Sequence, residues 1–257
     1  MSELKRVAEI KEELQAAEEI VLPSFILNYK DDKRAGVQKL VEQAAKRMAA
    51  LEQERKRIEG LKVYEKKYQD KGYVCGVDEA GRGPLAGPVV AGAVILPKEC
   101  DILYINDSKK LSPKKREELY DIIMDQAVAT GIGVVGPEKI DEINILQATY
   151  EAMRRAIQNL SVIPDILLND AVTIPKVEIT QIPIIKGDAK SISIGAASII
   201  AKVTRDRLME EYDKKYPAYG FSRNKGYGSR EHMEAILEHG SSPIHRQSFL
   251  TGIGKEK

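Results

Sequence analysis

The chain has 257 residues, 43% of them hydrophobic, which is enough for one globular core and a smaller appendage. With 40 Lys and Arg against 39 Asp and Glu, and few aromatic residues, the composition excludes both a chain-wide basic surface for a polyanion and a row of rings for stacking bases. No run of about 18 apolar residues could span a membrane, and the first residues lack the apolar centre of a secretory signal, so we expect a cytoplasmic protein without membrane contact.

Residues 1–71 are rich in Glu, Lys, Ala, Leu and Gln, with apolar residues at helical spacing between the charges. This pattern predicts a helical N-terminal extension. Pro23 should interrupt it, because proline lacks the amide donor that a helix interior needs. We expect a solvated appendage, and we keep the hypothesis that it raises substrate affinity or contacts another protein.

The composition changes at Gly72, where the main domain is expected to begin. Two β-branched runs, at residues 73–77 and 87–96, are separated by a glycine-rich turn and predict two paired strands. Cys75 and Cys100 lack the CxxC spacing of a zinc or redox site, so we expect both to be ordinary thiols.

The middle of the chain alternates predicted helices and strands. Residues 112–130 open with Ser112 as a cap, followed by a proline, and carry apolar positions at helical spacing. Residues 131–135 predict a strand, and residues 138–160 predict one long amphipathic helix.

Two further apolar runs, at residues 165–169 and 181–186, predict strands. Residues 195–216 return to helical spacing, and polar loops then surround one more predicted helix at residues 229–240. Strands that first pair as a hairpin and then alternate with helices favour an α/β sheet of mixed direction over a sandwich or a bundle.

The chain is therefore expected to have three parts. Residues 1–71 form the helical extension, residues 72–216 form the α/β core, and residues 217–257 form a small C-terminal lobe.

Carboxylates end or follow three of the predicted strands. Asp78 and Glu79 follow the first apolar run, Asp170 ends a later one, and Asp188 comes just after another. Strand ends in an α/β sheet commonly line the ligand crevice, so we expect these side chains to converge. Each position taken alone would more often be a turn former or a helix cap than a ligand, and Asp188 could cap the helix after it.

Converging carboxylates repel one another unless cations lie between them, and hard oxygen ligands suit Mg²⁺ or Mn²⁺. Two such ions about 4 Å apart can activate a water and stabilise the leaving oxygen in an attack on phosphorus. The pattern therefore favours hydrolysis of phosphodiesters. The alternative, that these carboxylates only form turns and cap helices, stays open.

The segment GVDEAGRGP, at residues 76–84, resembles the signature of the type 2 ribonucleases H, the ribonuclease HII family. Further similar segments follow in family order at residues 106–112, 167–170, 186–207, 224–229 and 241–250. The resemblance covers the chain from about residue 73 to residue 250. It implies a ribonuclease-H-like mixed sheet flanked by helices, with a C-terminal helical lobe.

The resemblance assigns catalysis and metal binding to one set of residues: Asp78, Glu79, Asp170 and Asp188. It implies that Mn²⁺ or Mg²⁺ lies between these groups and the substrate phosphate. The substrates would be the RNA strand of RNA-DNA hybrids and duplex DNA that contains a ribonucleotide, with 3′-hydroxyl and 5′-phosphate products. The sequence departs from the commoner family form at Ala171, where a glycine often follows the aspartate.

The turn made by Gly81, Arg82 and Gly83 resembles the family element that reads the sugar at an RNA-to-DNA junction. Glycines let the backbone approach the minor groove, where the 2′-hydroxyl separates RNA from DNA. Tyr227 is similar to the family tyrosine that packs on the deoxyribose after the junction. A lobe-core tyrosine is the structural alternative.

Phosphate contacts are expected from polar and basic residues near these motifs. The candidates by position are Arg82, Ser108, Lys109, Lys186 and Lys190. A solvated loop would use the same residue types. We do not assign His245 as a general base, because its place between a proline and an arginine suits a packed role and a metal-bound water needs no histidine.

Three other functions are weighed. A type 3 ribonuclease H would share the fold and carboxylates but is expected to lack the GRG turn. A non-catalytic hybrid-binding protein would not need all four carboxylates. A resolvase or integrase on the same fold would lack the GRG and NKGYG motifs. We expect a monomer, and the sequence leaves the choice between Mg²⁺ and Mn²⁺ open.

Overall fold

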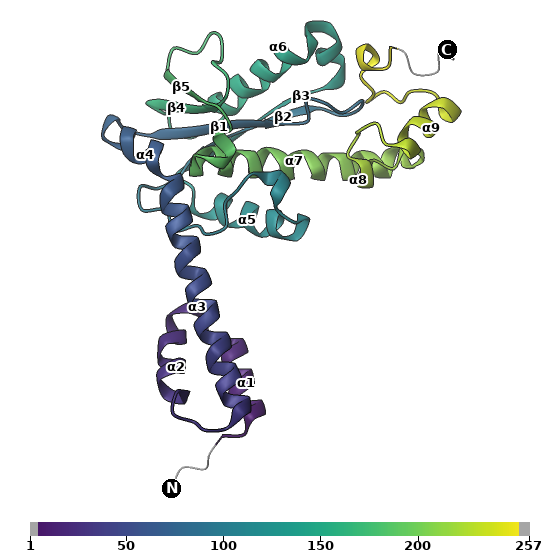
Figure 1. Cartoon of the computed structure of the whole chain (residues 1–257). Helices are drawn as coiled ribbons and strands as arrows, with labels where there is room; N and C mark the ends of the chain where they lie inside the picture. The colour runs from purple at the N-terminus through teal and green to yellow at the C-terminus, as the bar shows by residue number, and fades with distance from the viewer. Residues whose placement is uncertain (1–4, 252–257) are drawn as a thin grey trace. The chain divides into compact units, whose positions relative to one another are not determined.

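The computed structural model describes residues 5–251. The chain divides into two compact units, Met1–Glu59 and Gly60–Lys257, and each is described by itself. The first unit contains α1 (Val7–Ala16), α2 (Leu22–Tyr29) and most of α3 (Ala35–Leu61), as Figure 1 shows. The predicted helical extension is confirmed. Pro23 does not interrupt the helical run as predicted: it lies in the first turn of α2, where a helix tolerates proline, and the run is interrupted earlier, at Ala17 and Glu18.

The second unit is built on a five-stranded sheet in the order β3-β2-β1-β4-β5. β1 pairs antiparallel with β2 and parallel with β4, while β2 and β3 are antiparallel and β4 and β5 are parallel. The predicted sheet of mixed direction is confirmed. The strands are β1 (Val74–Ala80), β2 (Val89–Ile95), β3 (Ala129–Val135), β4 (Ile166–Asp170) and β5 (Thr180–Ile184).

Helices cover both faces of this sheet. α6 packs on one face, and α7 packs on the other with α5 beside it (Figure 1). Ser112 caps α5, as predicted, by accepting a hydrogen bond from the amide of Lys115. In the part of the chain that the model describes, no helix is both long and apolar enough to cross a membrane. The helices of this unit are α4 (Val63–Tyr68), α5 (Pro113–Gln126), α6 (Pro137–Gln158), α7 (Ile192–Lys215), α8 (Phe221–Asn224) and α9 (Arg230–His239).

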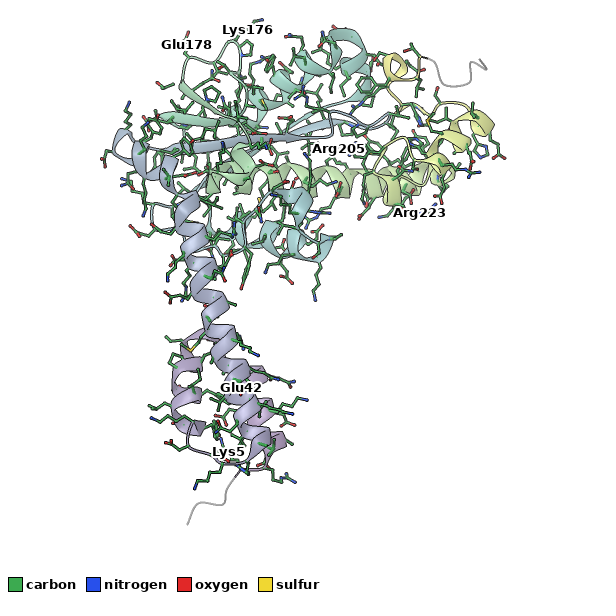
Figure 2. The ribbon with its side chains drawn as sticks, viewed as in Figure 1. Lys5, Glu42, Lys176, Glu178, Arg205 and Arg223 are labelled. Atoms are coloured by element: carbon green, nitrogen blue, oxygen red, sulfur yellow. The ribbon has the colours of Figure 1, made fainter. Side chains whose placement is uncertain are left out.

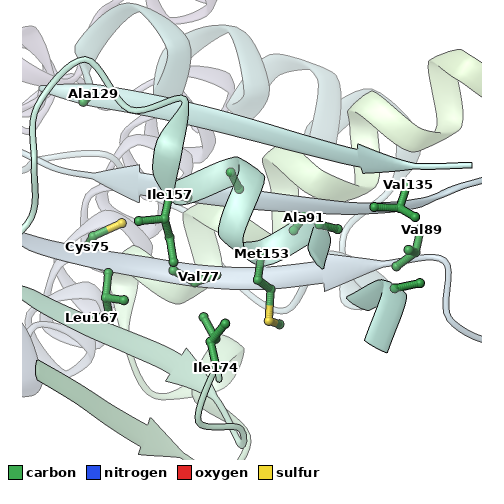
Figure 3. Packing of buried hydrophobic residues seen from close by; sticks show 14 of the residues in the cluster. Cys75, Val77, Val89, Ala91, Ala129, Val135, Met153, Ile157, Leu167 and Ile174 are labelled. Atoms are coloured by element: carbon green, nitrogen blue, oxygen red, sulfur yellow. The ribbon is translucent and has the colours of Figure 1, made fainter. Parts of the chain in front are cut away.

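The alternation of β1 divides its side chains between the two helical layers. Cys75 and Val77 are buried in the cluster that contains Met153 and Ile157 of α6, as Figure 3 shows. Successive side chains of a strand point to opposite faces, so Gly76 and the residues in step with it face α7. Both cysteines are buried and form no disulfide. Burial raises the pKa of the Cys75 thiol to about 12, so it remains a neutral core group, as predicted for an ordinary thiol.

Gly76 sets how closely α7 approaches the sheet. A Cβ atom at this position would overlap the backbone of Ser193 and Ile194, far inside the 3.4 Å of an ordinary contact. Glycine therefore lets the first turn of α7 lie directly on β1. This close approach brings the polar face of α7 to the end of the sheet where the carboxylates lie.

Two local predictions need correction. The helix predicted at residues 138–160 is broken at Asn144, whose φ of 65° and ψ of 164° are not helical. The side chain of Asn144 accepts hydrogen bonds from the amides of Leu146 and Gln147, so it caps the second part of α6. The strand predicted at residues 73–77 was also too short, because β1 continues through Asp78 and Glu79 to Ala80.

The alanine that follows Asp170 takes a backbone conformation suited to glycine. Ala171 has φ of 57°, and its amide donates to the carbonyl of Ile184, so the turn keeps the left-handed form in spite of the side chain. This conformation costs a non-glycine residue about 1 kcal/mol. We expect Ala171→Gly to raise the free energy of unfolding by up to about 1 kcal/mol. The added conformational entropy of glycine in the unfolded chain makes the gain smaller than this. Urea titration measures this change; a loss of stability would contradict the account.

Candidate active site

The sheet register brings two of the predicted carboxylates together. Val77 of β1 lies beside Asn169 of the parallel strand β4, so the next residues, Asp78 within β1 and Asp170 at the end of β4, lie on neighbouring strands with their side chains on the same face. This is the face covered by α7. The hydroxyl of Ser198, on α7, donates to Asp78. Asp78 and Asp170 therefore converge, as predicted, because the alternation of side chains along each strand points both toward the same face.

Asp188 reaches the same place from a short turn after β5. This turn is the 3-10 helix Gly187–Ala189, and the amide of Gly187 donates to Asp170 Oδ1 over 2.7 Å. The side-chain cap of α7 is Ser191, which accepts from the amide of Ile194. Capping of α7 is therefore the task of Ser191, and Asp188 is left to face the other carboxylates.

All four predicted carboxylates line one open cavity. Carboxylates and cations share this cavity with a few neutral side chains. Its lining consists of Asp78, Glu79, Ala80, Gly81, Arg82, Gly83, Ser108, Lys109, Arg116, Ile145, Asp170, Asp188, Ser198, Lys202, Arg205, Tyr227 and Phe249.

The carboxylates raise one another's proton affinity. Burial and the charge of Glu79 hold the pKa of Asp78, which is only 6% exposed, well above its usual value. Burial also raises the pKa of Glu79, against the lowering effect of Arg82, and Asp170 adds to the rise. Burial and the charge of Asp107 raise the pKa of Asp188. Burial and the neighbouring carboxylates thus both disfavour the charged forms of these side chains.

The donor chemistry of this site fits a hard divalent cation, because carboxylate oxygens are the ligands that Mg²⁺ and Mn²⁺ prefer. Within residues 5–251, no three His, Cys, Asp or Glu side chains are arranged to hold a metal ion as they stand. Glu79 is instead paired with Arg82, Nη1 to Oε1, over 3.3 Å. Asp170 and Asp78 accept backbone amides. A metal bound by Glu79 would therefore compete with Arg82, whereas each aspartate gives only its Oδ1 to a backbone amide.

The glycine-rich turn and the predicted tyrosine lie next to each other at the cavity. Gly81, Arg82 and Gly83 all line it, and so does Tyr227, whose side chain remains half-exposed. A Cβ at Gly83 would touch the tyrosine ring at 3.7 Å. Tyr227 is therefore at the cavity wall, although a lobe-core position was the alternative.

The predicted phosphate contacts divide into two groups. Lys109 lines the cavity, and its charge acts on Glu79 and Asp188. Ser108 lines it as well, but its buried hydroxyl is hydrogen-bonded to Ser198 over 3.0 Å. Lys186 and Lys190 are exposed and are not among the lining residues.

Sequence reasoning missed four polar residues of the cavity wall: Arg116, Ser198, Lys202 and Arg205. Three of them lie on α7 at spacings of four and three residues, which places them on one face of the helix. This polar row in an apolar helix was the available signal. Arg116 carries no comparable signal, because it lies on the surface-like helix α5.

His245 is packed in the core of the C-terminal part, as expected, and does not line the cavity. Its Nδ1 accepts from the amide of Ser242, so its Nε2 carries the proton and donates to Nε2 of His232 over 3.0 Å. Nδ1 of His232 then donates to the carbonyl of Tyr227. Both rings are therefore neutral in the folded state.

This pair predicts a loss of stability in weak acid. Burial and the charge of His232 lower the pKa of His245 to about 4. Because the unfolded state takes up the proton near pH 6.5, the stability is fully present above pH 6.5 and falls as the pH drops toward 4. We expect His245 to account for a loss of about 2 kcal/mol between pH 7 and pH 5. Urea titrations at both pH values should show a smaller loss for His245→Gln; equal losses would refute the assignment.

Comparisons with known proteins agree with this geometry. The family model described as Ribonuclease HII matches residues 75–252, and the model described as Ribonuclease HII N-terminal domain matches residues 6–69. The Ribonuclease HII of Lachnoclostridium phytofermentans is 60% identical over 96% of this chain and 98% of its own length. That of Bacillus subtilis is 52% identical over 95% of both chains.

A solved structure shows the same fold. The crystal structure of the ribonuclease H2 from Pyrococcus horikoshii has a TM-score of 0.58 and 35% identity, and the match covers 68% of this chain and 93% of that one. The region that the Ribonuclease HII family model matches, residues 75–252, includes the sheet and the helices that build the acidic cavity. The chain therefore belongs to the ribonuclease HII family, metal-dependent endonucleases that act on RNA-DNA hybrids.

Proposed function

We propose that the acidic cavity cuts the RNA strand of RNA-DNA hybrids, and also cuts on the 5′ side of a single ribonucleotide in duplex DNA, leaving 3′-hydroxyl and 5′-phosphate ends. The observation that carries this proposal is the convergence of Asp78, Glu79, Asp170 and Asp188 in one cavity next to the 81–83 turn. Two bound Mg²⁺ or Mn²⁺ ions would activate the attacking water and neutralise the leaving oxygen.

The chain's own residues would orient the substrate around that centre. Asp78 and Asp170 are the first candidates for metal ligands, because they lie side by side on adjacent strands with their side chains on one face. Glu79 and Asp188 would complete the set. Lys109, Arg116 and Lys202 supply positive charge to the same cavity and would hold phosphates of the two strands.

Recognition of the ribose is assigned to the 81–83 turn and Tyr227. The 2′-hydroxyl both donates and accepts hydrogen bonds, and a backbone turn with glycine at both ends can approach it closely. The ring of Tyr227 would pack on the following deoxyribose, where the extra hydroxyl of a ribose would clash or lose its hydrogen bonds. The protein would thus select an RNA-to-DNA junction.

A fluorescent duplex with one ribonucleotide tests this function directly. With Mg²⁺ or Mn²⁺ we expect one cut on the 5′ side of the ribonucleotide, with a 3′-hydroxyl that a polymerase can extend, and no cut in the all-DNA duplex. EDTA should stop the reaction. A uniform RNA-DNA hybrid is the positive control; cleavage of the hybrid with none of the single-ribonucleotide duplex would limit the proposal to hybrids, as a type 3 enzyme behaves.

The substitution Tyr227→Ala should affect the two substrates unequally. We expect a loss of about tenfold in kcat/KM on the single-ribonucleotide duplex, equal to about 1.4 kcal/mol of lost stacking on the sugar. The loss on a uniform hybrid should be smaller, because a ribose follows each cut there. Parallel kinetics on both substrates measure the ratio, and equal losses would assign Tyr227 to the lobe core instead.

The N-terminal unit and the oligomeric state belong to the proposal as well. We propose that the protein acts as a monomer and that residues 1–71 add affinity for the duplex. Light scattering tests the first point. Titration of hybrid with the full chain and with a chain lacking those residues tests the second; equal affinities would leave the extension a passive appendage.

A further inference from the structure

Two arginines outside the proposed catalytic set are completely buried beneath the 81–87 loop. Arg205 comes from α7 (Figure 2) and is 1% exposed, and Arg246 comes from the C-terminal segment and is 0% exposed. Within residues 5–251, neither side chain forms an ion pair with a carboxylate. Burial of two cations without counter-ions is costly, so their hydrogen bonds must compensate.

Within the described residues, every side-chain hydrogen bond of these arginines goes to a backbone carbonyl. Arg246 donates from Nη2 to Gly81, from Nη1 to Arg82 and from Nε to Gly87, over 2.6, 2.9 and 2.9 Å. Its own amide donates to the carbonyl of Leu85. One side chain thus spans both ends of the loop.

Arg205 completes the support from the side of α7. It donates to the carbonyls of Ala86, Pro88 and Lys225 over 3.1, 2.9 and 2.9 Å. Gly81 lies directly against it, since a Cβ there would overlap Arg205 Nε. The first glycine of the turn is therefore required by this buried arginine as well as by its φ of 92°.

The carbonyls that accept from Arg246 determine the direction of the amides in the 81–83 turn. In a trans peptide the carbonyl of one residue and the amide of the next point in opposite directions. Because the carbonyls of Gly81 and Arg82 point to Arg246, the amides of Arg82 and Gly83 point away from it. Among the described hydrogen bonds of the backbone, neither amide has an acceptor. Both residues line the cavity, so these donors are available to an oxygen of the substrate.

We infer that Arg246 and Arg205 are positioning residues, which hold the 81–87 loop with its amides toward the substrate and thereby set the selectivity for a single ribonucleotide. The inference rests on the proposed function of the cavity. Their two positive charges also add to the attraction of the cavity for a polyanion. Burial and the neighbouring Arg205 lower the pKa of Arg246 to about 9, which still leaves it charged at neutral pH.

The test uses Arg246→Lys and Arg205→Lys in the full chain. Lysine keeps the charge, but its compact ammonium cannot span carbonyls that a planar guanidinium reaches as a fork. Ile123→Ala, a buried change on α5, serves as a control for lost stability. Urea titration first establishes that each variant is folded and how much stability it has lost.

Two measurements follow on the folded variants. Amide hydrogen exchange of a peptide over residues 80–88 should become at least tenfold faster in the arginine variants than in Ile123→Ala. The ratio of kcat/KM for a single-ribonucleotide duplex to that for a uniform hybrid should fall about tenfold. A uniform hybrid offers a 2′-hydroxyl at every position, so a displaced turn still meets one, whereas a lone ribonucleotide offers only one.

The outcomes separate the inference from the proposed function. Unchanged exchange in both folded arginine variants would overturn the support of the loop, whatever the enzyme cuts. Faster exchange with an unchanged substrate ratio would overturn the positioning role. If the wild type did not cut the single-ribonucleotide duplex, the proposed selectivity would fail while the exchange result would stand alone.

Discussion

Asp78→Asn should lower hydrolysis of an RNA-DNA hybrid by roughly 10³-fold, a loss of about 4 kcal/mol of transition-state stabilisation. Asp78 is buried at the strand end between Glu79 and Asp170, so its carboxylate is the oxygen ligand least replaceable by another group. Asparagine retains the shape and can still accept from Ser198. The change therefore removes charge from the cavity without removing the packing.

The same substitution should not destabilise the fold. Because burial and Glu79 raise the pKa of Asp78, its charged form is disfavoured in the folded protein. We expect the free energy of unfolding at neutral pH to stay the same or to rise by about 1 kcal/mol. Single-turnover kinetics and urea titration give both numbers. Asp125→Asn, on the exposed part of α5, is the matched control and should retain full activity. Near-normal activity of Asp78→Asn would remove Asp78 from the catalytic set.

The sequence was sufficient for the architecture because its strands contain apolar runs and the long helices α3 and α6 have apolar residues at helical spacing. The carboxylates were found for the same reason: acidic residues at the ends of apolar runs are conspicuous, and the parallel pairing of β1 with β4 then makes Asp78 and Asp170 neighbours. The break in α6 was not predicted, since Asn144 is neither proline nor glycine and lies within apolar helical spacing.

The sequence could not show where single side chains point or how deeply they are buried. Lys186 and Lys190 flank Asp188 in sequence, but Lys186 adopts the left-handed conformation at the start of a tight turn and both lysines are exposed. Arginine is normally a surface residue, so composition gives no sign that Arg205 and Arg246 are buried. Their partners are backbone carbonyls, which leave no trace in the sequence.

Gly76→Ala should cost both stability and activity, because this glycine links the fold to the site. The added Cβ would overlap backbone atoms of Ser193 and Ile194, which cannot rotate away as a side chain could. α7 must therefore retreat from β1 by about 1 Å, and we expect a loss of about 3 kcal/mol in the free energy of unfolding. Ser198 and Lys202 would move with the helix, away from Asp78.

A shift of that size at a catalytic centre can lower the rate about 10²-fold even though no reacting group has changed. If α7 retreats, we expect kcat to fall on every substrate. A change in the 81–87 loop should instead alter the ratio of kcat/KM for the single-ribonucleotide duplex to that for the uniform hybrid. Gly136→Ala is the control within the same unit, since a Cβ there meets nothing within 4 Å. It should stay within about 1 kcal/mol of the wild type and keep its activity. Equal stability and kcat in Gly76→Ala and Gly136→Ala would contradict this account. The close contact of α7 with β1 would then not be needed to align the carboxylates with the polar face of that helix.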